Sequence, residues 1–108
     1  MNRVVVTGIG IVSSLGNNQQ EVKESLYHTK SGISFDEDQK KMGFRSCVSG
    51  QIKIDLENSI ERKFLRFMGD GASYNYLSML EAIKDSNLSE DEISNNKTGL
   101  IMGSGGPS

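Results

Sequence analysis

Two glycines near the amino terminus are the first residues whose spacing is typical of cofactor binding. In VVVTGIGIVSS, residues 4 to 14, Gly8 and Gly10 follow an apolar run, as in the phosphate-binding turn of dinucleotide-binding proteins. The complete G-x-G-x-x-G pattern needs a third glycine, and Ser13 occupies that place. Because β-branched residues continue beyond Gly10, we favour one long strand, Arg3 to Val12, with glycines where another backbone lies close.

Nucleophilic or metal chemistry would have to use one cysteine and one histidine. Cys47 has neither a histidine nor a helix amino terminus beside it in the sequence, so we interpret it as an ordinary small side chain. His28 falls in the last turn of an expected helix, with no serine, cysteine or carboxylate placed to make it a base. Because the two residues are far apart in sequence, we expect no bound metal.

A cluster of cations is the third candidate. Arg62, Lys63 and Arg66 place three positive charges on about one helical turn, in a chain whose net charge is −2. Such a local basic patch can steer an acidic partner. Taken alone, however, the cluster is more simply a solvated helix face.

The carboxyl-terminal GSGGPS, residues 103 to 108, follows an expected strand. It has no Lys-Ser or Lys-Thr pair to contact a phosphate or magnesium ion. We therefore predict a turn at the carboxyl end of a strand, where α/β folds place their ligand crevices.

Composition limits the class of protein. The 108 residues fit one small domain, and 35% hydrophobic with 24% charged residues gives no overall attraction to nucleic acid or to an anionic membrane. One cysteine excludes an internal disulfide framework, and no signal peptide or membrane span is evident. We expect a cytoplasmic protein.

Local patterns predict the elements around these residues. A helix begins after Asn18, which with Glu21 resembles a capping box, and Gly32 ends it. Val22 and Leu26 lie on one face of this helix, which we expect to be buried.

The most helical region follows residue 58. We predict a short helix near Glu61 to Phe67, a break at the glycines, a long helix from Asp70 to Ser86, and a single turn capped by Ser89 with Glu92. The long helix carries an apolar stripe at three- and four-residue steps: Ala72, Tyr76, Met79, Leu80 and Ile83.

Two further strands are expected. Ile52, Ile54 and Leu56 alternate with charged residues, as a half-buried strand requires. A turn at Asn95-Asn96-Lys97 precedes a strand from Thr98 to Met102.

Several stretches together resemble the amino-terminal part of the β-ketoacyl-[acyl-carrier-protein] synthases, most of all the type I condensing enzymes of bacterial fatty acid synthesis. The resemblance runs from Asn2 to the end of the chain. The stretches that carry it are RVVVTGIGIVSSLGNNQQEV, SGISF, ERKFLRFMGD, YLSMLEAI and GLIMGSGG.

The resemblance implies an α/β fold of the thiolase type, with αβαβα layers, of which this chain holds part of the first half. It implies a homodimeric acyltransferase without cofactor, which joins malonyl-carrier protein to an acyl group held on a cysteine and releases carbon dioxide. The family's nucleophilic cysteine, two histidines and lysine match no residue of this chain. We therefore expect residues 1–108 to be an incomplete amino-terminal domain without activity of its own.

The resemblance also assigns roles to residues inside the chain. It implies that Arg62, Lys63 and Arg66 help to dock the acidic acyl carrier protein. It implies that Gly105, Gly106 and Pro107 border the acyl pocket. Pro107 stands where the type I enzymes usually have glycine, and because proline fixes φ and lacks an N–H, chain-length preference does not follow.

Two alternatives remain open at this point. One is a free-standing carrier-binding module without catalysis, which would require this chain to fold alone. The other is the nucleotide-binding protein that Ser13 already disfavours.

Overall fold

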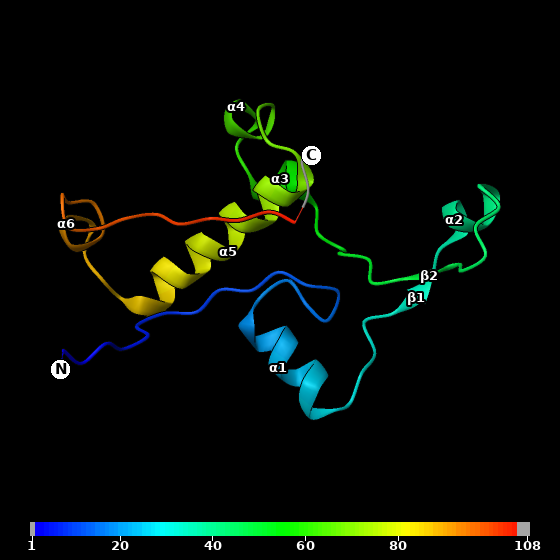
Figure 1. Ribbon diagram of the computed structural model, residues 1–108, viewed down its shortest axis with the longest axis horizontal. Coiled ribbons are helices and arrows are strands. Elements are labelled where there is room, and N and C mark those ends of the chain that lie inside the picture. The colour runs from blue at the N-terminus through cyan, green and yellow to red at the C-terminus, as the bar shows by residue number, and fades with distance from the viewer. Residues whose placement is uncertain (1, 106–108) are drawn as a thin grey trace. The chain divides into compact units, whose positions relative to one another are not determined.

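The computed structural model describes residues 2–105 as two compact units (Figure 1). One unit contains residues 12–54, and the other contains the residues up to Ile11 together with those from Asp55 onward. The described elements, in chain order, are α1 (Gln19–Tyr27), β1 (Ser34–Phe35), α2 (Glu37–Lys41), β2 (Val48–Ser49), α3 (Leu56–Ser59), α4 (Arg62–Leu65), α5 (Asp70–Ser86) and α6 (Glu90–Ile93).

Helix α5 dominates its unit and has the bounds that the sequence predicts. Gly69 precedes it in an extended conformation, and Asn87 ends it with φ of 54°, in the left-handed region that asparagine tolerates. The expected apolar stripe is only partly covered, because Tyr76, Met79 and Ile83 are half-buried. Leu80 is exposed.

Gly8 and Gly10 lie against the backbone of α5. A Cβ on Gly8 would stand 2.7 Å from the backbone nitrogen of Ser86, and one on Gly10 would stand 2.8 Å from that of Ala82. Both would also collide with backbone carbonyl oxygens of the helix. The structure confirms that these glycines permit close packing, and it places them along a helix rather than at the opening of one.

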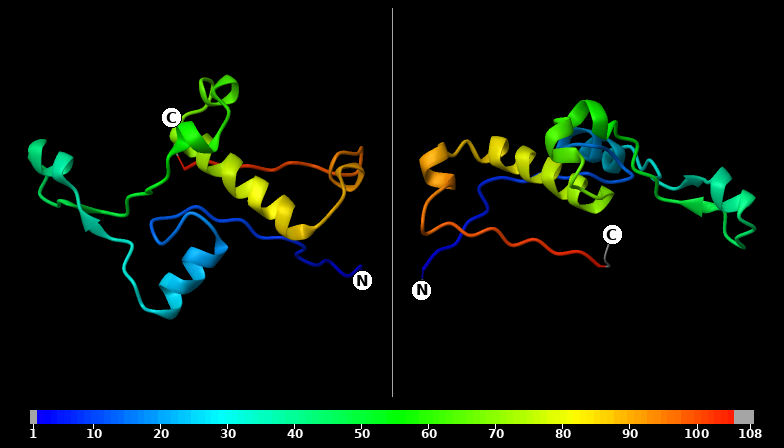
Figure 2. Two further views of the ribbon diagram at one scale, coloured as in Figure 1. Left: turned by 180° about the vertical axis from the view of Figure 1, so that it is seen from behind. Right: turned by 90° about the horizontal axis from the view of Figure 1, so that it is seen from above.

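Two acidic side chains of α5 bind the same amino-terminal segment. The N–H of Ile9 donates to Asp85 Oδ2 at 3.0 Å, and the N–H of Ile11 donates to Glu81 Oε2 at 2.9 Å. Four residues of helix and two residues of extended chain both advance roughly 6 Å, so the carboxylates match the spacing of these N–H groups. Both views of Figure 2 show the segment passing along α5.

The predicted strand from Arg3 to Val12 is wrong for the described chain. Residues 3–12 are extended but pair with no strand among residues 2–105. Val4 is 91% and Val6 is 81% exposed. The β-branched pattern correctly gave extended backbone, but pairing also requires a neighbouring strand edge, which a local pattern does not specify.

The predicted strands Ile52–Leu56 and Thr98–Met102 are wrong for the same reason. Ile52 and Ile54 are more buried than Lys53 between them, but the segment pairs with nothing described, and Leu56 begins α3. Residues 98–102 follow the expected turn, in which Thr98 N–H donates to the Asn95 carbonyl at 3.1 Å. They then run as an exposed, extended segment (Figure 2).

Helix α1 forms in the unit of residues 12–54 with the expected cap. Asn18 Oδ1 accepts from the N–H of Glu21 at 2.9 Å. Val22 is buried as predicted, whereas Leu26 is 63% exposed and Ser25 is buried in its place, donating to the Leu15 carbonyl at 2.7 Å. The helix ends at Tyr27, before Gly32.

A short antiparallel pair, β1 and β2, carries α2 between its strands. Asp36 accepts from the N–H of Gln39 at 3.1 Å and from the hydroxyl of Ser49 at 2.9 Å. These hydrogen bonds, with one from Gln51, lower the pKa of the Asp36 carboxyl. Asp36 thus caps α2 and ties it to β2.

The covered core is small. Among the described residues, Val22 and Ile60 are the buried apolar side chains, one in each unit. Ser73 is also fully buried, and its hydroxyl donates to the Gly69 carbonyl at 3.1 Å. Neither unit by itself encloses a sizeable apolar core.

Candidate functional site

The three predicted cations lie on the α3–α4 pair. Asp55 caps the amino terminus of α3, where its carboxylate accepts from the N–H of Asn58 at 3.2 Å and from its side-chain amide at 2.6 Å. The side-chain hydrogen bond is the larger cause of a lowered Asp55 pKa. α3 ends at Ser59, and the next residue, Ile60, is 4% exposed and lies in the connection to α4.

The sequence predicted the position of α4 well and its length less well. The helix covers Arg62–Leu65, and single turns carry the chain on to Met68. Arg62 and Arg66 are four residues apart and share one side, while Lys63 lies beside Arg62. The structure therefore brings the three predicted residues together as one exposed basic surface.

Two aromatic rings are part of this surface. Lys63 Nζ lies 4.7 Å from the centroid of Phe64, and Arg66 Cζ lies 4.5 Å from that of Phe67. Phe64 is 42% and Phe67 is 77% exposed. A surface with both cations and exposed rings can attract an acidic partner at long range and bury apolar area on contact.

A cavity that no sequence pattern indicates lies beside these cations. It has a volume of about 450 Å³, and its lining residues are Glu57, Asn58, Arg62, Leu65 and Arg66. The two guanidinium groups outnumber the one carboxylate in this lining, Glu57, and they favour a carboxylate or another anion because each presents several N–H donors. We call Arg62, Lys63, Arg66, Phe64 and Phe67, with this cavity, the basic surface.

Gly105 alone of the three predicted acyl-pocket residues lies within the described chain. It is exposed, and no atom lies within 4 Å of where its Cβ would stand. Gly106 and Pro107 lie outside the described residues.

A wide, mostly apolar cavity of about 770 Å³ lies between α5, α6, Gly8 and the exposed segment of residues 98–102, with Leu100 and Ile101 in its wall.

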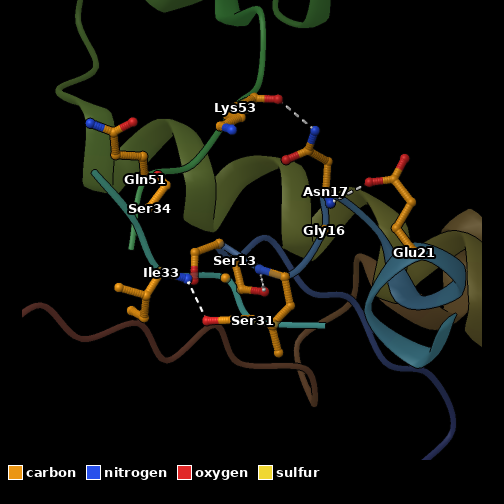
Figure 3. Close-up of a pocket in the computed structure, with 12 residues that line it drawn as sticks. Ser13, Gly16, Asn17, Glu21, Ser31, Ile33, Ser34, Gln51 and Lys53 are labelled. Carbon is orange, nitrogen blue, oxygen red and sulfur yellow. Dashed lines mark hydrogen bonds between the residues drawn. The ribbon is translucent and has the colours of Figure 1, made fainter. Parts of the chain in front are cut away.

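A smaller, polar cavity of about 240 Å³ lies in the unit of residues 12–54 (Figure 3). Ser13 and Gly16 close a tight turn at its wall by two backbone hydrogen bonds of 2.9 and 3.2 Å. The side-chain amide of Asn17 donates to the Lys53 carbonyl at 2.8 Å and so joins two segments of the wall (Figure 3).

The nucleotide interpretation finds no support in this cavity. The N–H of Glu21 in the first turn of α1 is already bonded to Asn18, so it is not offered to a phosphate. The Glu21 carboxylate lines the cavity and accepts from the N–H of Asn17 at 2.8 Å, and a second anion there would be repelled.

Cys47 and His28 have ordinary surroundings. The thiol of Cys47 donates to the Phe44 carbonyl at 3.5 Å, and the His28 ring meets the Tyr27 ring edge-on at a centroid distance of 5.2 Å. Within residues 2–105, no group of three histidine, cysteine or acidic residues is arranged to hold a metal ion. None of the helices in that range has the length and apolar character needed to cross a membrane.

Comparison with known proteins identifies the family. The family model described as "Beta-ketoacyl synthase, N-terminal domain" matches residues 1–107. The chain belongs to the β-ketoacyl synthase family. The resemblance inferred from the five sequence stretches is thereby confirmed, and a thiolase-like fold is the one that this family implies.

Curated relatives place the chain within the β-ketoacyl synthases. It is 52% identical to 3-oxoacyl-[acyl-carrier-protein] synthase 1 of Haemophilus influenzae over 97% of the chain, and 52% identical to the synthase 1 of Escherichia coli K12 over 100%. It is 32% identical to 3-oxoacyl-[acyl-carrier-protein] synthase 2 of Vibrio cholerae over 95%. The chain spans only about a quarter of these relatives, 26%, 27% and 25% of their lengths.

Proposed function

We propose that this chain is the amino-terminal part of a 3-oxoacyl-[acyl-carrier-protein] synthase of type I, with the basic surface docking the acyl carrier protein. The observation that carries the proposal is the 52% identity to synthase 1 over essentially the whole chain, against 32% to a synthase 2. The docking role rests in addition on the three cations that the structure brings together.

The proposed reaction is a decarboxylative condensation. Malonyl-carrier protein loses carbon dioxide, the resulting carbanion attacks the thioester carbonyl of an acyl group held on a cysteine, and the cysteine leaves as thiolate. One carbon–carbon bond forms, one carbon–carbon and one carbon–sulfur bond break, and 3-oxoacyl-carrier protein is released. In this proposal the cysteine, two histidines and lysine come from sequence outside this chain, in a homodimeric synthase.

The extended segments take their place in the same proposal. Residues 3–12 and 98–102 become strands of the layered αβαβα core when the rest of the domain supplies strand edges and covering helices. Their exposed valines, leucine and isoleucine support this assignment, since such side chains are normally covered in α/β proteins. Gly105, Gly106 and Pro107 then border the acyl pocket.

Docking is tested by reversing charge in the synthase that contains this chain. The double variant Lys63→Glu, Arg66→Glu is expected to raise the KM for acyl carrier protein at least about ten-fold, since each lost charge-assisted contact changes affinity several-fold. kcat changes little, because neither side chain contacts the reacting atoms. The dependence of kcat/KM on ionic strength becomes flatter.

The matched control is Lys84→Glu, Lys97→Glu, which makes the same change in net charge at exposed positions away from the basic surface. The control is expected to keep the KM within about two-fold of the wild type, because rim and remote charges contribute little. An equal rise in KM for both double variants would contradict docking at the basic surface.

A further inference from the structure

The three cations of the basic surface are not equally available. Lys63 Nζ lies 2.6 Å from Glu61 Oε2, in an ion pair whose side chains are 63% and 66% exposed. Arg62 and Arg66 form no ion pair within residues 2–105, and both line the 450 Å³ cavity. An incoming carboxylate therefore meets two guanidinium groups that have no ion pair among the described residues, with Glu57 in the same lining, and one ammonium group that is already paired.

The Glu61 side chain is available for this pairing. Glu61 occupies the position before α4 with φ of −56° and ψ of 130°, and its backbone carbonyl accepts from the N–H groups of Phe64 and Leu65, but its carboxylate makes no capping hydrogen bond to the helix. Residues two apart do not face each other inside a helix, but Glu61 lies outside it and can turn back to Lys63. The Phe64 ring, 4.7 Å from the same ammonium, holds Lys63 from a second side.

We propose that Glu61 competes with the acidic side chains of the docking partner for Lys63 and thereby weakens docking. This inference rests on the proposed carrier-docking function. Docking exchanges the internal Glu61–Lys63 ion pair for one between proteins, whereas Arg62 and Arg66 bind without such an exchange. Glu61 thereby lowers the affinity of the basic surface for its partner.

The expected size of the effect is modest. Exposed ion pairs are worth at most about 1 kcal/mol, which corresponds to a change of about five-fold in an equilibrium constant. Removing the charge of Glu61 is therefore expected to lower the KM for acyl carrier protein about two- to five-fold. kcat stays unchanged, because Glu61 acts only on Lys63.

A double-mutant cycle in the synthase that contains this chain separates competition from general repulsion. The four proteins are the wild type, Glu61→Gln, Lys63→Gln and the combination, and the measurement is the KM for acyl carrier protein at fixed ionic strength. Competition predicts that Glu61→Gln lowers the KM in the wild-type background and leaves it unchanged in the Lys63→Gln background.

The other outcomes overturn the inference in distinguishable ways. An equal decrease in both backgrounds shows that Glu61 repels the partner directly and not through Lys63. No decrease in the wild-type background, with a raised KM for Lys63→Gln, sinks the competition but leaves docking intact. An unchanged KM for Lys63→Gln contradicts docking by Lys63 and the inference with it.

Discussion

At the scale of single residues, replacing either of two glycines of one unit by alanine is expected to change the stability of the protein in opposite directions. Gly10→Ala places a Cβ against the α5 backbone at Ser78 and Ala82, so we expect a loss of about 1–3 kcal/mol of stability. Gly71→Ala, in the first turn of α5, meets no atom within 4 Å and is expected to stabilise by up to about 1 kcal/mol through helix propensity.

Urea unfolding of the intact protein with each variant measures both effects. A Gly10→Ala protein as stable as the wild type would show that the segment does not pack on α5 as described. Gly71→Ala controls for the general cost or gain of replacing glycine, since it makes the same chemical change without the contact.

The same scale shows which residue roles the sequence could reveal. Asn18 caps α1 as predicted, because a cap needs only the residues within one turn. Leu26 was wrongly expected to be buried, since which face of α1 is covered depends on the distant turn whose Leu15 carbonyl binds Ser25. The Glu61–Lys63 pair had no sequence signal, because residues two apart do not face each other within a helix and the pairing depends on α4 beginning at Arg62.

At the scale of elements, α6 is expected to depend on pH through its capping box. Glu92 accepts from the N–H and the hydroxyl of Ser89 at 2.9 and 2.8 Å, and these bonds, the backbone one first, lower the pKa of the Glu92 carboxyl from its ordinary value. A folded pKa below the unfolded one means that the cap contributes fully above the unfolded pKa and is lost as the pH falls through the folded pKa.

An NMR titration of the Ser89 amide proton checks that the pKa of the Glu92 carboxyl is lowered and not raised. The chemical shift should move with a midpoint below the pKa of a glutamate in an unfolded peptide, and the transition should disappear in Glu92→Gln. A midpoint at or above that value would mean that the capping box does not favour the charged carboxylate.

The elements that the sequence predicts correctly are those whose bounds depend only on neighbouring residues. The bounds of α5 and the capped turn α6 follow from helix period, glycines and caps within a few residues, and both predictions are confirmed. The strands at residues 3–12, 52–56 and 98–102 were predicted from patterns that fix extended backbone but not a pairing partner. The strands that do pair, β1 and β2, contribute two residues each, and no periodic pattern in the sequence predicted them.

At the scale of the whole molecule, the family was predictable and the core was not. Sequence stretches spread along the whole chain resemble those of the β-ketoacyl synthases, and the family model over residues 1–107 confirms the family. The layered arrangement stays a prediction, because the described residues bury only Val22 and Ile60 among their apolar side chains. Which apolar side chains are buried depends on contacts between residues far apart in sequence, which local patterns do not specify. The chain spans about a quarter of its relatives' length.

The central claim of the proposed function is that this chain supplies part of the fold and recognises the acyl carrier protein. The reacting groups come, in this proposal, from the rest of a larger synthase. Its most direct test measures carbon dioxide release from carboxyl-labelled malonyl-carrier protein, with the purified 108-residue chain and with the synthase that contains it, at equal molar concentration. The account predicts release by the synthase and none above background by the 108-residue chain. Turnover by the 108-residue chain alone would contradict it.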